Sequence, residues 1–497
     1  MEFPVKTGAA ASQRTECAIL PVFEDGQLRG ATREIDTAAR GIIKQLVRKG
    51  DISGRIGATT LIHRTQGTAA ARWLLVGCGK HADFNARRLT SALTAAIAGL
   101  RHSGTKEAIS YLAYGVGGGL NAGDAARHSV EAARASVYRF DELKSRTDPS
   151  PRLTRLGLAA PRGTNVVPLR AAIKVGTAIA NGSDLARDLG NRPPNVCTPS
   201  HLAEAARKLA RRHSKLKIKV LGEPEIRKLG MGALLSVTQG ADEPPRLIVI
   251  EYRNGPAKEA PIALCGKGVT FDTGGISLKP PPKMDEMKFD MSGAGSVLGA
   301  MSAIAELGAP VNVVGVIPAC ENMPGGRATR PGDIIKSMSG QTVEIINTDA
   351  EGRLILCDAI TYARQQLKPR CVIDIATLTG ACVVALGHIY TGVFSNDDAL
   401  AAALIAAGDR ALDLAWRLPM HEEYGESLRS NFADFANSGS RDGGASVGAN
   451  FLSRFVDGVP WAHLDIAGVA WRSNSHKGST ARPVPMLVDF LLSTERQ

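Results

Sequence analysis

The stretch that decides the fold is Val311-Asn-Val-Val-Gly-Val-Ile-Pro-Ala319, a run of mainly β-branched and apolar residues. A strand that is apolar at successive positions is buried on both faces of its sheet, which is typical of parallel sheets covered by helices. Helical spacing is found near 293–307 and 351–366. The sequence therefore predicts an α/β domain with a mostly parallel sheet and helices on both faces. Four further strand-like runs support this prediction: RLIVIEY (246–252), PIALCG (261–266), TVEII (342–346) and CVIDIAT (371–377).

The N-terminal third shows the same alternation on a smaller scale. Short apolar runs such as 17–23 and 72–77 alternate with helical patterns such as Arg33 to Arg48, which predicts a second α/β domain. A polar stretch with prolines near 145–155 is followed by one long predicted helix from Leu169 to Leu189. The chain is therefore expected to have three parts: an N-terminal α/β domain (1–165), a connecting helix (166–194) and a C-terminal domain (195–497).

The overall composition is that of a globular protein. The 497 residues are 44% hydrophobic and 22% charged, and no apolar run reaches the roughly 18 residues of a transmembrane helix. The N-terminus lacks the apolar segment of a signal peptide, so we expect a cytoplasmic protein without a membrane partner. The eight cysteines show no CxxC spacing, which favours reduced thiols over disulfides or a zinc ribbon.

The positive charge is concentrated in the N-terminal third. Residues 1–170 hold 25 Lys and Arg against 14 Asp and Glu, which accounts for +11 of the formal net charge of +12. A solvated basic surface is the ordinary interpretation of such an excess. The alternative is a binding surface for nucleic acid or another acidic partner.

The first candidate site segment follows the apolar run 261–266. It places Lys267, Asp272 and Lys279 within thirteen positions, among glycines. The segment lacks the GK[ST] ending and the glycine spacing of a phosphate-binding loop, so a nucleotide site of that kind is excluded. The carboxyl ends of strands are where open α/β sheets bind ligands.

Two further segments add carboxylates. Asp290 lies just before a predicted helix of small residues, where helix N-capping is the alternative role. Asp349 and Glu351 follow a strand and precede a helix; at this i, i+2 spacing an extended chain points both side chains to one side. Their alternative role is that of acidic residues favoured at a helix N-terminus. Asn347 and Arg353 flank them, and Asn347 is placed to orient a ligand.

Four carboxylates in one site can hold two divalent ions, which activate water and polarise the bond that is attacked. A two-metal nuclease or phosphoesterase could use the same carboxylates. The lysines distinguish the candidates, because Lys267 lies among the ligands, where its amine could itself bind metal. The alternative is that Lys267 simply pairs with the acids.

These segments resemble the leucyl aminopeptidase (cytosol aminopeptidase) family. The heptapeptide Asn-Thr-Asp-Ala-Glu-Gly-Arg at 347–353 is highly specific to it, and the resemblance covers roughly residues 180–497. The resemblance implies that 195–497 is a catalytic peptidase domain that releases N-terminal residues, mainly leucine and other apolar ones, through a hydroxide bridging two Mn²⁺ or Zn²⁺ ions. Further agreeing stretches lie at 191–199, 331–333, 377–380, 443–446 and 461–471.

The resemblance also implies residue roles. One ion would be held by Lys267, Asp272, Asp290 and Glu351, and the other by Asp272, Asp349 and Glu351. Lys279 would stabilise the oxyanion, and Arg353 would hold a bicarbonate ion that serves as general base; a salt bridge of Arg353 to a ligand carboxylate is the alternative. The family further implies a homohexamer, and some bacterial members also bind DNA. The residues expected to contact the substrate are Met287, Asn347, Thr377, Leu378 and Gly380.

Overall fold

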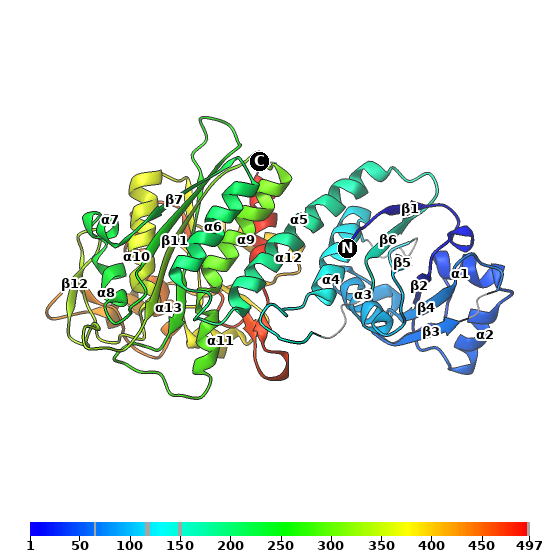
Figure 1. Cartoon of the computed structure of the whole chain (residues 1–497), viewed down its shortest axis with the longest axis horizontal. Helices are drawn as coiled ribbons and strands as arrows, with labels where there is room; N and C mark the ends of the chain where they lie inside the picture. Colours follow the sequence, from blue (N-terminus) through cyan, green and yellow to red (C-terminus); the bar gives the residue numbers. More distant parts are fainter. Residues whose placement is uncertain (64–65, 115–119, 148–151, 495–497) are drawn as a thin grey trace. The chain divides into compact units, whose positions relative to one another are not determined.

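The chain forms two α/β units, Met1–Ala180 and Asn181–Gln497, and helix α5 (Val166–Asn191) runs across the division between them (Figure 1). The predicted boundaries at 165 and 194 lie close to this division and stay predictions. No helix among the described residues is both long and apolar enough to cross a membrane. The computed structural model describes residues 1–63, 66–114, 120–147 and 152–494.

The N-terminal unit is built on a six-stranded sheet in the order β1-β6-β5-β2-β4-β3, parallel except for β3. Alternate residues of β2 enter different cores: Cys17 and Ile19 pack with α3 and α4, whereas Ala18 and Leu20 pack with α1 and α2. The α/β prediction for this unit is thus confirmed. Its elements are β1 (Val5–Thr7), β2 (Cys17–Val22), α1 (Gly30–Ala38), α2 (Ile42–Lys49), β3 (Thr59–His63), β4 (Arg72–Gly77), α3 (Ala86–Leu100), β5 (Glu107–Ser110), α4 (Ala122–Val137) and β6 (Arg155–Ala160).

The C-terminal unit is built on a nine-stranded sheet. Its path is β16-β15-β18-β14-β9-β11-β8-β7, and β10 also pairs with β11. The central strands β18, β14, β9, β11 and β10 are parallel, while β15, β8 and β7 add antiparallel pairs towards the edges. The strands are β7 (Leu216–Leu221), β8 (Arg246–Arg253), β9 (Ile262–Gly266), β10 (Gly268–Asp272), β11 (Asn312–Asn322), β14 (Cys371–Ala376), β15 (Thr391–Ser395), β16 (Ala415–Arg417) and β18 (Trp461–Asp465).

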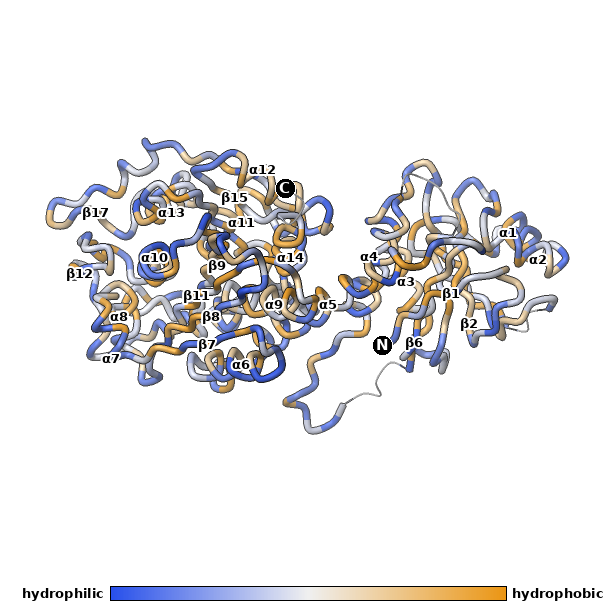
Figure 2. The backbone as a smooth tube through the Cα atoms, turned by 90° about the horizontal axis from the view of Figure 1, so that it is seen from above, coloured by the Kyte–Doolittle hydropathy of each residue, from blue (hydrophilic) through white to orange (hydrophobic). Residues whose placement is uncertain are grey.

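Helices cover both faces of this sheet, as the continuous apolar runs predicted. Helix α9 packs through Val297 against Gly315 of β11, whereas α10 lies over the opposite face with Cys265 and Val316 (Figure 1). The strands in the middle of each unit are coloured mainly as hydrophobic in Figure 2. The helices are α6 (Pro199–Arg212), α7 (Glu223–Lys228), α8 (Gly232–Thr238), α9 (Ser292–Leu307), α10 (Gly352–Tyr362), α11 (Gly380–Leu386), α12 (Asp398–Arg410), α13 (Gly444–Ser453) and α14 (Val484–Ser493).

One predicted strand lies outside the large sheet. The run 342–346 forms only β13 (Thr342–Glu344), which pairs with β12 (Ile334–Lys336) and β17 (Phe435–Ala436) in a separate three-stranded sheet. Only Val343 of β13 is buried. The strand therefore has one face towards the core, unlike a strand that is buried on both faces. Its assignment to the main sheet was therefore wrong.

Candidate functional site

Polar residues end or follow five neighbouring strands at one edge of the large sheet. Asp272 ends β10, Asn322 ends β11 and Asp465 ends β18; Lys267 follows β9 and Thr377 follows β14. Because these strands run parallel, their carboxyl ends meet at the same edge. The topology of the sheet thus brings together segments that lie almost 200 residues apart.

Three buried carboxylates converge at this edge. Asp272, Asp290 and Glu351 each offer an oxygen, and these oxygens lie within 4.8 Å of one another. Burial, and then the negative charge of Asp272, raises the pKa of Glu351 to about 7; burial likewise raises the pKa of Asp290. Three carboxylates this close repel one another unless nearby cations neutralise them. The Oε2 atom of Glu351 has no hydrogen-bond partner among the described residues. This donor set fits hard divalent ions.

Lys267 supplies positive charge at the centre of the cluster. Its Nζ lies 2.8 Å from Asp290 Oδ2 and 2.7 Å from Glu351 Oε1, and it donates a hydrogen bond to the carbonyl of Thr377. Burial by itself lowers the pKa of Lys267, but the surrounding carboxylates outweigh this and raise it. The pairing that the sequence left open as an alternative is therefore present in this structure.

Gly352 leaves the space that Lys267 occupies. A Cβ atom at Gly352 would lie only 2.7 Å from Lys267 Cε and 2.8 Å from its Nζ. The glycine after Glu351 is thus required by the close approach of Lys267, which lies 85 positions earlier in the sequence.

Lys279 lies on the other side of the cluster. Its Nζ is 2.9 Å from Asp272 Oδ2 and also contacts Asp349 Oδ1. The Asp349 side chain is 33% exposed, and it lies outside the group of three converging carboxylates. Burial raises the pKa of Asp349 to about 6, against the lowering effect of Lys279. Lys279 thus holds its charge at the more open side of the site.

Two alternatives left open by the sequence are now decided. Asp290 is not a helix cap, since Met291 occupies the N-cap position of α9 and Asp290 Oδ1 accepts a 2.6 Å hydrogen bond from Thr377 Oγ1. Glu351 is the N-cap residue of α10, and it also belongs to the carboxylate cluster. Both roles considered for it therefore apply. The prediction of an extended chain from Asp349 to Glu351 was wrong. The chain turns just before Glu351, where Ala350 N donates to Asn347 O at 3.2 Å.

Arg353 is buried at the first turn of α10. Its Nη1 donates to the carbonyl of Asn437 at 2.8 Å, and its guanidinium carbon lies 6.0 Å from the ring centre of Phe451. Burial lowers the pKa of Arg353 to about 10. Within the described residues no carboxylate forms an ion pair with Arg353, and its Nε has no hydrogen-bond partner. A buried guanidinium with a free donor suits an anion, so the salt-bridge alternative was wrong.

The five residues expected at the substrate lie on three segments: η3, the loop before α10 and 377–380. Met287 lies half-buried on the 3-10 helix η3 (Met284–Met291), and Gly380 is exposed at the first turn of α11. Leu378 is half-buried and its N–H donates to Asp465 Oδ1. Asn347 turns its side chain onto its own loop, where Oδ1 accepts from Asp349 N at 2.9 Å. Thr377, by contrast, contacts Asp290 and Lys267 of the cluster.

Two buried asparagines were missed by sequence reasoning. Asn322 donates from Nδ2 to Asp272 Oδ1 at 2.8 Å and to Thr348 O at 3.0 Å, so it ties two site segments together. Asn437, the residue after β17, binds the loop 346–350. A polar residue at the end of an apolar strand was the available indication for Asn322; the sequence around Asn437 offered none.

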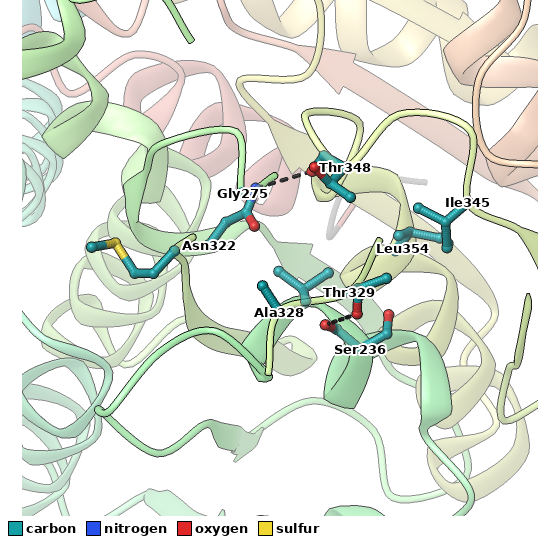
Figure 3. Close-up of a pocket in the computed structure, with 10 residues that line it drawn as sticks. Ser236, Gly275, Asn322, Ala328, Thr329, Ile345, Thr348 and Leu354 are labelled. Atoms are coloured by element: carbon teal, nitrogen blue, oxygen red, sulfur yellow. Dashed lines mark hydrogen bonds between the residues drawn. The ribbon is translucent and has the colours of Figure 1, made fainter. Parts of the chain in front are cut away.

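A pocket lies beside this loop, next to Asn322. It is lined by residues of α8, of the loop after β11 and of the segment 345–354. Figure 3 shows Asn322 reaching Thr348 on one side of the pocket and Thr329 reaching Ser236 on the other. The loop that carries Asp349 therefore borders a small pocket on one flank.

Comparison with known proteins identifies the family of both units. Residues 184–488 match the catalytic domain of the cytosol aminopeptidase family, and residues 19–147 match the N-terminal domain of that family. A probable cytosol aminopeptidase of Paraburkholderia phymatum is 49% identical over 505 residues, with 100% of both chains covered. One from Ralstonia pickettii is 51% identical and covers 98% of this chain and 97% of its own.

Solved structures agree over nearly the whole chain. A mutant of tomato leucine aminopeptidase superimposes with a TM-score of 0.89 at 32% identity, covering 99% of this chain and 96% of its own. The bottromycin maturation enzyme BotP has a TM-score of 0.85 at 34% identity, covering 97% and 100%. A second BotP structure, in complex with Mn, has a TM-score of 0.84 at 34% identity and covers 97% and 99%.

Proposed function

This chain belongs to the cytosol aminopeptidase family and is an aminopeptidase, and we propose that it uses two divalent metal ions to release N-terminal residues, mainly leucine and other apolar ones. The observation that carries the metal requirement is the buried group of Asp272, Asp290 and Glu351, with an unpaired oxygen on Glu351. A wholly buried group of three carboxylates is costly unless cations neutralise it.

The proposed ligands are Lys267, Asp272, Asp290, Asp349 and Glu351. Lys267 can act as a ligand only after losing a proton, because an ammonium group has no lone pair to donate. The bound ions would activate a water molecule, polarise the peptide carbonyl and take the free α-amine, which restricts cleavage to the N-terminus. The Mn complex of BotP supports manganese, and zinc is the second candidate.

The remaining roles belong to side chains of the chain itself. Lys279 holds a positive charge at the open side of the cluster, where it would stabilise negative charge developing on the carbonyl oxygen. Arg353 offers a buried guanidinium with an unpaired Nε, which suits a bicarbonate ion as proton acceptor. Asn347 would orient the ligand. The residues that would contact the first side chain are Met287, Thr377, Leu378 and Gly380.

We expect a metal-stripped enzyme to lose activity on leucyl amides and to regain it with Mn²⁺ or Zn²⁺. The protein is treated with a chelator, its metal content is measured by mass spectrometry, and leucyl, alanyl, lysyl and glutamyl amides are assayed after readdition of Zn²⁺, Mn²⁺, Co²⁺ or Mg²⁺. The leucyl amide should be cleaved fastest. Full turnover by protein with no measurable metal would contradict the proposal, and release of phosphate from an aryl phosphate would favour the two-metal phosphoesterase.

A hexameric, cytoplasmic enzyme completes the proposal. The name of the relatives, cytosol aminopeptidase, supports the location. Val384, Trp416 and Phe432 leave large apolar side chains exposed in the single chain, as is typical of interaction surfaces. Light scattering coupled to gel filtration measures the mass of the assembly.

The basic N-terminal unit does not lead us to propose DNA binding. Several of its cations are paired with acids, among them Lys6 with Glu107 and Arg88 with Asp83. We expect any DNA binding to be non-specific and to disappear as salt rises, because counterion release would dominate it. Gel shifts with the full chain, and with residues 1–170 exchanged for a neutral relative, test this; a shift that survives high salt would contradict the expectation.

A further inference from the structure

The side chain of Asn437 makes four hydrogen bonds, all of them to the backbone of the loop 346–350. Its Oδ1 accepts from the N–H groups of Ile346 (2.8 Å) and Asn347 (3.2 Å). Its Nδ2 donates to the carbonyls of Asn347 (2.7 Å) and Ala350 (3.3 Å). A primary amide has two donors and two acceptor lone pairs, so every one of them is used. The Asn437 side chain is 0% exposed, so it lies wholly inside the protein.

The main chain of Asn437 extends the same connection to both ends of the loop. Its N–H donates to the carbonyl of Glu344 at 2.9 Å, just before the loop. Its carbonyl accepts from Arg353 Nη1 at 2.8 Å, just after the loop. One residue thus fixes the strand that enters the loop, the loop itself and the guanidinium that follows it.

Packing alone does not hold this loop in place. Ile346 at its start is 49% exposed, and the pocket shown in Figure 3 lies along Ile345 and Thr348 on its inner flank. The loop carries Asp349 and leads directly to Glu351. Besides Asn437, the side chain of Asn322 also holds it, through Thr348 O. The position of the carboxylates therefore depends on hydrogen bonds to the loop backbone.

We propose that Asn437 is a positioning residue for the aminopeptidase reaction. It acts by fixing the loop that carries Asp349 and leads into α10, where Glu351 and Arg353 lie. This inference rests on the proposed function. It assigns to Asn437 an effect on metal affinity and on kcat, because a carboxylate displaced by a fraction of an ångström binds its ion less well and misplaces the reacting groups.

The chain offers a matched control in Asn312, at the start of β11 and so at the opposite edge of the sheet. Asn312 is also buried, and its amide also holds a loop: Oδ1 accepts from Gly255 N at 3.0 Å, and Nδ2 donates to Pro256 O at 2.8 Å and Glu259 O at 3.0 Å. Removing either amide takes hydrogen-bond partners from the backbone of a partly buried loop. Of these two asparagines, only Asn437 holds a loop of the site.

The experiment compares Asn437→Ala, Asn437→Asp and Asn312→Ala with the unaltered enzyme. For each protein we would measure the thermal unfolding midpoint, the metal concentration that gives half-maximal activity, and kcat and KM for a leucyl amide at saturating metal. We expect both alanine variants to unfold at lower temperature. Only the Asn437 variants should lose kcat, by about 10–100-fold, and need more metal. Asn437→Asp keeps the side-chain volume but replaces the two donors, so it should resemble Asn437→Ala.

The proposal is overturned if the Asn437 variants match Asn312→Ala in kcat and in metal requirement, since Asn437 would then contribute only to stability. It is also overturned if neither Asn437 variant folds, because folding would then be its role. The unaltered enzyme separates the two hypotheses: if it shows no metal-dependent cleavage of leucyl amide, the proposed function itself fails, whatever the variants do.

Discussion

Glu351→Ala is expected to lower kcat/KM for a leucyl amide by several orders of magnitude and to reduce the amount of bound metal. Glu351 is buried, pairs with Lys267 and leaves its second oxygen unpaired beside Asp272 and Asp290. Removing it takes one negative charge from a group proposed to neutralise two dications. Steady-state kinetics at saturating Mn²⁺ or Zn²⁺ and metal analysis of the purified protein measure both effects.

Asp358→Asn is the control for a buried carboxyl group. Asp358 lies seven positions further along the chain, is fully buried, and accepts hydrogen bonds from Leu234 N (2.9 Å) and Met338 N (2.7 Å). Burial raises its pKa to about 7, as for Glu351. We expect this variant to unfold more easily but to keep native metal content and kcat. Near-native turnover with two bound ions in Glu351→Ala would refute the ligand assignment.

Lys279→Ala is expected to lower kcat by about 10²–10³-fold, comparable to the loss of one oxyanion-hole donor. Lys279 places its ammonium beside Asp272 and Asp349 at the more open side of the cluster. Its charge would act where negative charge develops in the transition state, so kcat should fall far more than metal affinity. Kinetics and a metal titration of the same preparation separate the two.

Lys283→Ala removes the same charge from the same segment. Lys283 is exposed, and no ion pair joins it to a described acid of the cluster. We expect its kcat and metal affinity to remain close to those of the unaltered enzyme. If Lys279→Ala merely lost its metal and regained full kcat when metal was added in excess, Lys279 would be needed for binding the ions and not for the chemical step.

The sequence by itself determined the class of fold and the family. Continuous apolar runs such as 311–319 and 371–377 can be buried only in a sheet covered on both faces, so the α/β architecture followed from local pattern. The heptapeptide 347–353 identified the family, because it concentrates the acidic residues Asp349 and Glu351 and the basic Arg353 in one short segment. Lys267, Asp272, Asp290 and Glu351 could each be found in this way, since each lies at or just after the end of a strand or just before a helix.

Only the tertiary structure decided how these residues meet and what holds them. Hydrogen bonds and ion pairs between remote segments leave no periodic pattern in the sequence, so the role of Asn437 in binding the loop 346–350 could not be read from its neighbours. The same holds for Thr377, whose hydroxyl orients Asp290, and for the position of β13 outside the large sheet. Strand pairing and long-range contacts fix these features, because they depend on where separate parts of the chain converge.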